Sequence, residues 1–126
     1  MAVAGYKGSI WDRFWSKVDS SGGADACWPW VGAKSVKRSG TLRGVLQVAG
    51  RRSRIVLAHR FALCLVFGGL ALDELLAEYD ALFDDGSRRE ACHRCNNRLC
   101  CNPHPNHLYW GTQEQNRADR YRVEAA

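Results

Sequence analysis

The stretch CHRCNNRLCCNPHPNHL, residues 92–108, holds four cysteines and three histidines in seventeen positions. A structural zinc ion takes four cysteine or histidine ligands in a tetrahedron, and ligands spaced two to four residues apart let the chain turn around it. The spacing therefore predicts a zinc site that organises the fold at this point. Spacing alone leaves the choice of ligands open. The candidates are Cys92, Cys95, Cys100, Cys101, His104 and His107.

Length and composition indicate one small domain. The chain has 126 residues, of which 46% are apolar, and six cysteines, so we expect a single domain over residues 1–126 with a modest core. Residues 1–20 lack the basic and apolar segments of a secretory signal. We therefore expect an intracellular protein with reduced thiols, cytoplasmic in a bacterial or phage host or nuclear in a eukaryote. No apolar run reaches the roughly 20 residues that cross a bilayer, so no membrane contact is expected.

Positive charge is concentrated in one stretch of a chain whose net charge is +5. Residues 31–60 contain eight basic residues and no acidic one, whereas residues 70–90 contain seven acidic residues and two arginines. A basic stretch with interleaved apolar residues is typical of a surface that contacts nucleic-acid phosphates. A solvated face that only keeps the protein soluble is the alternative. The predicted DNA-binding residues are Lys37, Arg38, Arg43, Arg51, Arg52 and Arg54.

The pattern of apolar residues predicts short elements around this stretch. The sequence LRGVLQVAGRRSRIVLAHRF, residues 42–61, predicts a basic β-hairpin over about residues 42–58 with its turn near Gly50. Such a ribbon fits the major groove of DNA. Apolar spacing predicts a short helix over residues 58–67 and an amphipathic helix over residues 72–83 with an acidic outer face. Thr112 and Gln115 form a capping-box pattern that opens a helix ending near residue 123.

The sequence HRCNNRLCCNP, followed three residues later by HL and then by an asparagine nine residues after that histidine, resembles a known active-site motif. It is similar to HNH endonucleases, more specifically to the His-Cys box homing endonucleases and their phage relatives. The segments RFWSKV, CWPW and AHRFA upstream also resemble the phage members. The resemblance therefore covers most of the chain, from Phe14 to Asn116.

The resemblance implies the fold, the ligands and the catalytic residues. The fold would be a small zinc-stapled α+β domain with a ββα-metal (His-Me finger) active site over about residues 90–123. His93 would be the general base, Asn116 would bind a catalytic Mg²⁺, and Arg43 would support the leaving group. The implied ligands of the structural Zn²⁺ are Cys27, Cys95, Cys100 and His107. His104 remains an alternative to His107, because the loop before His107 is two residues longer than the family pattern, and Cys92 or Cys101 remains an alternative to Cys27.

These assignments describe a reaction that the residues can support. A neutral imidazole, whose pKa is near 6.5, can take a proton from water at physiological pH, and one Mg²⁺ can neutralise the charge that develops on a phosphodiester. We therefore expect an Mg²⁺-dependent endonuclease of double-stranded DNA, homing-type or phage HNH, with a possible homodimer where both strands are cut. The competing hypothesis is a catalytically inactive, zinc-stabilised DNA-binding module. His59 and Cys64 are expected to be structural.

Overall fold

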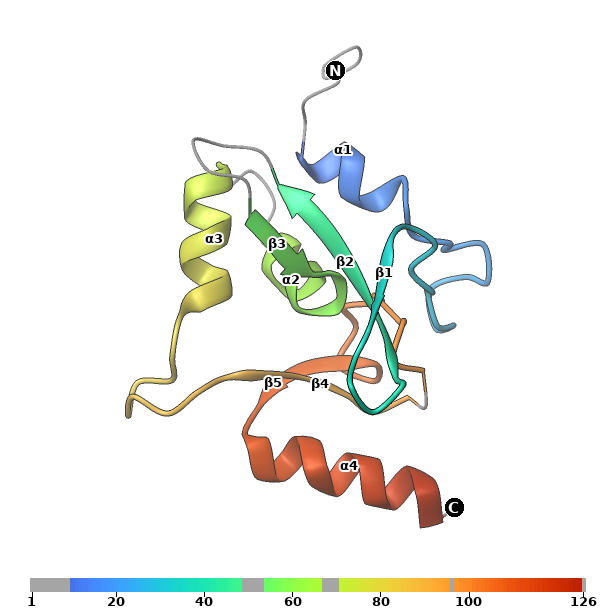
Figure 1. Ribbon diagram of the computed structural model, residues 1–126, viewed down its shortest axis with the longest axis vertical. Helices are drawn as coiled ribbons and strands as arrows, with labels where there is room; N and C mark the ends of the chain where they lie inside the picture. Colours follow the sequence, from blue (N-terminus) through green and yellow to red (C-terminus); the bar gives the residue numbers. More distant parts are fainter. Residues whose placement is uncertain (1–9, 49–53, 67–70, 96, 126) are drawn as a thin grey trace.

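The computed structural model describes residues 10–48, 54–66, 71–95 and 97–125. In these residues helices and strands alternate irregularly, which confirms the expected mixed α+β class (Figure 1). The helices are α1 (Ile10–Trp15), α2 (Ala58–Leu65), α3 (Leu72–Asp80) and α4 (Gln113–Ala125). The strands are β1 (Lys34–Val36), β2 (Leu42–Val48), β3 (Arg54–Leu57), β4 (Glu90–His93) and β5 (Leu108–Gly111). None of the described helices is long and apolar enough to cross a membrane.

The basic stretch forms an antiparallel sheet in the order β1-β2-β3. Alternate residues of β2, Gly44, Leu46 and Val48, are buried, as expected for a strand with one face on the core. The predicted pairing of β2 with β3 is confirmed, with Leu46 opposite Val56. Strand β1 is an addition that the sequence did not predict, because three residues carry too little pattern. The predicted turn near Gly50 lies outside the described residues.

A second hairpin, β4 and β5, is followed directly by α4, which packs against β4. In this hairpin Glu90 pairs with Gly111 and His93 with Leu108. The predicted capping box at the start of α4 is confirmed, since the Thr112 N–H donates to Gln115 Oε1 and the Gln115 N–H donates to Thr112 Oγ1. Figure 1 shows α4 on the far side of this hairpin from the three-stranded sheet. The strands and the helix therefore bring the end of β4 beside the first turns of α4.

Helix α2 joins the two sheets. It contacts β2 and β3 on one side and β4 and β5 on the other, so the core is built around it (Figure 1). Phe61, Cys64 and Leu65 of this helix are fully buried, and Phe14 and Trp30 pack on the same cluster. Cys64 is thus a core residue, as predicted. Because α2 holds both sheets, the basic sheet and the second hairpin face each other across a fixed gap.

The acidic helix α3 ends at Asp80 and not at Phe83, so its predicted extent is wrong. The physical reason is Arg89, whose guanidinium donates to the carbonyl oxygens of Glu78 and Ala81 and so satisfies the end of the helix. Ala81 is already extended, with ψ of 150°. Asp80 forms a paired contact with Arg54, with oxygen–nitrogen distances of 2.5 and 2.9 Å. Part of the negative charge of α3 is therefore neutralised by Arg54 within the molecule.

Gly44→Ala should destabilise the protein through a clash with a fixed aromatic ring. A Cβ at position 44 would lie 2.5 Å from Trp30 Cδ1 and 3.1 Å from Ala58 Cβ, and the Trp30 ring is held by a hydrogen bond to the Ala33 carbonyl. Overpacking of this kind typically costs about 1–3 kcal/mol. Urea unfolding of zinc-loaded protein, with the exposed Val36→Ala as the control, measures the difference. An unchanged midpoint for Gly44→Ala would contradict the packing described for β2.

Candidate metal centre and adjoining pocket

Three thiols and one imidazole meet in a group that could hold a structural metal such as zinc. The ligand atoms of Cys27, Cys95, Cys100 and His107 all lie within 4.8 Å of one another. His107 Nδ1 is 3.6 Å from Cys27 Sγ and 3.7 Å from Cys100 Sγ. With zinc–sulfur and zinc–nitrogen bonds of about 2.3 and 2.1 Å, a tetrahedral site places such atoms about 3.6 Å apart. The predicted set of four ligands is therefore the set that the fold assembles.

Backbone hydrogen bonds bring Cys27 to the other three ligands from far upstream. The Trp30 N–H donates to the Leu99 carbonyl and the Cys101 N–H to the Trp28 carbonyl. Asn102 adds a buried side chain, whose amide donates to the carbonyls of Ala24 and Ala26 at 3.0 and 2.7 Å. Sequence reasoning did not assign this role to Asn102, although its place beside a proline was the available signal. The segment before β1 is thus fixed against the loop that follows β4.

Contacts outside the group prepare the ligand atoms for a metal. His107 Nε2 lies 2.8 Å from the carbonyl oxygen of Asp25, which can only accept, so Nε2 carries the proton and Nδ1 is left for the ion. The interaction between the neighbouring Cys95 and Cys100 thiols lowers the pKa of Cys100 and raises the pKa of Cys95. The thiolate is the form that binds metal. The group therefore already contains one thiol that ionises easily.

The structure also decides between the alternative ligands. His104 is exposed, and its Nδ1 accepts from the Asn106 N–H. The residues before His107 form a turn, in which the N–H groups of His107 and Leu108 both donate to the His104 carbonyl. Cys92 and Cys101 are fully buried outside the group. The turn therefore places His107, and not His104, among the three thiols.

A matched pair of variants tests this choice of histidine. We expect His107→Ala to lose the bound zinc, because it removes one of four ligands, and His104→Ala to retain one zinc per chain because its ring is exposed and outside the group. Zinc content after dialysis, measured by atomic emission, gives the result for both. Retention of zinc by His107→Ala together with its loss from His104→Ala would reverse the assignment.

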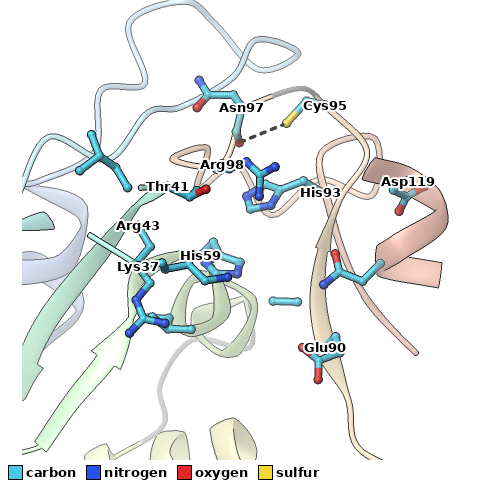
Figure 2. Close-up of a pocket in the computed structure, with 14 residues that line it drawn as sticks. Lys37, Thr41, Arg43, His59, Glu90, His93, Cys95, Asn97, Arg98 and Asp119 are labelled. Atoms are coloured by element: carbon cyan, nitrogen blue, oxygen red, sulfur yellow. Dashed lines mark hydrogen bonds between the residues drawn. The ribbon is translucent and has the colours of Figure 1, made fainter. Parts of the chain in front are cut away.

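A pocket opens beside the metal centre and draws on both halves of the fold. Its wall includes residues of the β1–β2 hairpin, α2, β4, the loop after β4 and α4 (Figure 2). His93, Asn116 and Arg43, the three residues given catalytic roles from the resemblance, all line it. Cys95 lines the pocket as well as belonging to the metal group. The pocket and the metal centre therefore share one loop.

His93 is held at two points on the wall of this pocket. Its Nε2 lies 3.2 Å from the carbonyl oxygen of Cys100, so Nε2 carries the proton and Nδ1 is the basic nitrogen. Its ring stacks on that of His59, with ring centres 4.8 Å apart and planes 29° apart. Burial lowers the pKa of His93, which keeps the imidazole neutral. His59, expected to be only structural, is thus a neighbour of the proposed base.

Further charged residues line the pocket that sequence reasoning did not assign to the site. Arg98, from the loop after β4, adds positive charge, while Glu90 and Asp119 add negative charge. Asp119 is buried and accepts a hydrogen bond from the Tyr109 hydroxyl. Figure 2 shows Lys37 and Arg43 on one side of the pocket and Asp119 on the other. The spacing of three residues after Asn116 was the sequence signal for Asp119.

Four of the six predicted DNA-binding residues are described, and these separate into three groups. Lys37 and Arg43 line the pocket, and the Arg43 Nε donates to Ser35 Oγ. Arg38 is exposed at the tip of the β1–β2 hairpin. Arg54 is paired with Asp80, so its charge is partly neutralised within the molecule. The remaining two, Arg51 and Arg52, lie outside the described residues.

Comparison with known proteins gives no relative for this site. No protein-family model matches the chain, and neither a curated protein nor a solved structure matches it. The functional interpretation therefore depends on the geometry and chemistry of the residues themselves.

Proposed function

We propose that this chain is a metal-dependent endonuclease of double-stranded DNA, in which β4, β5 and α4 form a ββα-metal (His-Me finger) active site. The observation that carries the proposal is the pocket that His93, Asn116 and Arg43 share, since these residues lie on three separate elements. A base, an oxygen ligand and a guanidinium around one pocket are what phosphodiester hydrolysis requires.

His93 acts as the general base in this proposal. Because Nε2 donates to the Cys100 carbonyl, Nδ1 is free to take a proton from the attacking water. Cys100 also belongs to the metal group, so a structural ion held there would fix the loop whose carbonyl orients the base. A small domain benefits from such a staple, because core packing alone holds a loop of this length weakly. The metal centre thus has a positioning role and no direct part in the reaction.

The oxygen donors in the pocket suit a hard cation. Asn116 contributes an amide oxygen and Asp119 a carboxylate to the same wall, and Mg²⁺ prefers such ligands. Asn116 would hold the ion, which when bound supplies neutralisation of the charge that develops at the phosphate and the leaving oxygen. The hydroxyl of Tyr109 donates a hydrogen bond to Asp119 and so holds this carboxylate on the wall of the pocket.

Basic residues on the opposite wall would receive the DNA backbone. Arg43 and Lys37 come from the β1–β2 hairpin, and Arg98 comes from the loop after β4. One guanidinium group can donate two hydrogen bonds to two oxygens of the same phosphate. Arg43 is therefore the candidate for supporting the leaving 3′ oxygen. The exposed Arg38 continues the basic edge beyond the pocket. The substrate is therefore a nucleic acid held by its phosphates next to His93.

The test is DNA cleavage by zinc-loaded protein titrated with Mg²⁺ and, in parallel, treated with EDTA. We expect cleavage that requires Mg²⁺, and an Asn116→Ala variant that needs a higher Mg²⁺ concentration and cleaves at least tenfold more slowly, because it lacks the oxygen ligand. Asn106→Ala, an exposed amide of the loop outside both sites, is the matched control. Equal Mg²⁺ dependence in the wild type and in Asn116→Ala would remove Asn116 from the proposed site.

A further inference from the structure

His59 has an unusual environment for a residue that only fills space. It is the second residue of α2, its ring stacks on His93, and it lines the same pocket. Its Nδ1 is buried and has no hydrogen-bond partner among the described residues. Figure 2 shows the two histidines next to each other on the wall of the pocket, reaching it from different elements.

A buried polar atom without a partner needs a reason. Leaving a buried donor or acceptor unpaired costs about 1–3 kcal/mol, and a phenylalanine would fill a similar volume without that cost. Burial lowers the pKa of His59 to about 3, so its ring is neutral beside the neutral ring of His93. Two neutral aromatic rings can stack without charge repulsion. The ring has two contacts in return, the stack on His93 and a hydrogen bond to the Ala91 backbone.

We propose that His59 is a positioning residue for His93, whose ring plane it fixes by stacking while the Cys100 carbonyl fixes the tautomer. This inference rests on the proposed function, because it concerns the orientation of the imidazole that is the proposed general base. The hydrogen bond at Nε2 restrains one atom of the imidazole and does not by itself fix the orientation of the ring plane. The stacked ring removes that freedom, since it occupies one face of the imidazole.

The second restraint matters because proton transfer depends on position. Catalytic groups must stay within about 0.5 Å and 10–20° of their productive geometry. A displacement of about 1 Å can slow a reaction about 100-fold without changing the residues that react. His59 belongs to α2, the helix that contacts both sheets, so its ring is carried into the pocket by a packed element of the core. Through the ring contact, His59 therefore restrains His93 against the core helix.

Two variants at this position separate stacking from simple space filling. His59→Leu removes the aromatic face and keeps an apolar side chain, whereas His59→Phe keeps the face and removes the unpaired nitrogen. We expect kcat to fall about 10- to 100-fold in His59→Leu with KM and zinc content unchanged, and His59→Phe to restore most of kcat.

The measurement is steady-state cleavage of a fluorescent duplex by the zinc-loaded full chain, beside the wild type and His93→Ala. Wild-type kcat in His59→Leu would overturn the inference and leave the proposed function standing. Loss of kcat in both variants would assign the effect to the imidazole nitrogen and overturn stacking as the cause. A wild type that binds DNA and never cuts it would overturn the proposed function and this inference with it. Where His59→Leu fails to fold, His59→Gln serves as the variant without the ring.

Discussion

His93→Ala should lower the rate of DNA cleavage by about 10²- to 10⁴-fold, the range that a positioned general base contributes. The reason is the geometry of its ring, which donates from Nε2 to the Cys100 carbonyl and leaves Nδ1 to accept a proton. Single-turnover cleavage of a bound duplex measures the chemical step directly. DNA affinity and zinc content should stay at wild-type values, because His93 lies outside the metal group.

The matched control for this variant is His104→Ala, which removes an exposed histidine of the same loop. We expect it to cleave at the wild-type rate, since its ring lies outside the pocket and outside the metal group. Full cleavage by a folded His93→Ala variant would contradict the assignment of the base. The His59 stack and the Cys100 hydrogen bond would then need another explanation.

Removal of the metal ligand at Cys100 should unfold the region that carries the site. Structural zinc contributes an apparent 10–16 kcal/mol in zinc-finger peptides at neutral pH, whereas a whole domain of ordinary stability has only about 5–15 kcal/mol. Cys100 provides both a ligand and the carbonyl that orients His93. Cys100→Ser should therefore lose zinc, lower the melting temperature by more than about 10 °C and abolish cleavage.

Cys101→Ala provides the comparison, because Cys101 is adjacent in sequence and fully buried but lies outside the metal group. It should keep one zinc per chain and lose only the stability expected for a shortened core side chain. Circular dichroism melting with zinc analysis on both variants measures the effect. Cys100→Ser with one tightly bound zinc and the melting temperature of the wild type would contradict the described metal centre.

Residue type and spacing predicted a metal group in residues 92–108 but left the choice of ligands open, and the resemblance implied the four that the fold brings together. Cys95, Cys100 and His107 lie in one short stretch, and resemblance to a known motif supplied Cys27. The sequence does not indicate how Cys27 is brought next to the other three ligands. That depends on Asn102 and on backbone hydrogen bonds between segments some 70 residues apart. Backbone pairing of this kind leaves no pattern in the side chains.

The elements show a similar division between local and distant causes. The hairpin of β2 and β3 follows from alternating side chains, and the start of α4 follows from its capping box. The end of α3 at Asp80 is set by Arg89, which lies beyond the helix. Its guanidinium donates hydrogen bonds to the carbonyls of Glu78 and Ala81. His59 was read as structural because its stacking partner, His93, lies on another element. Contacts across elements therefore account for what local patterns missed.

Cleavage of a randomised library of double-stranded DNA, with and without Mg²⁺, tests the central claim most directly. A library avoids dependence on one target sequence, and sequencing of the new ends records each cut and its position. We predict new 5′ ends that require Mg²⁺, appear with wild-type protein and are lost with His93→Ala. Library DNA that the wild type binds but leaves intact at every Mg²⁺ concentration would contradict the nuclease and identify the chain as a zinc-stabilised DNA-binding module.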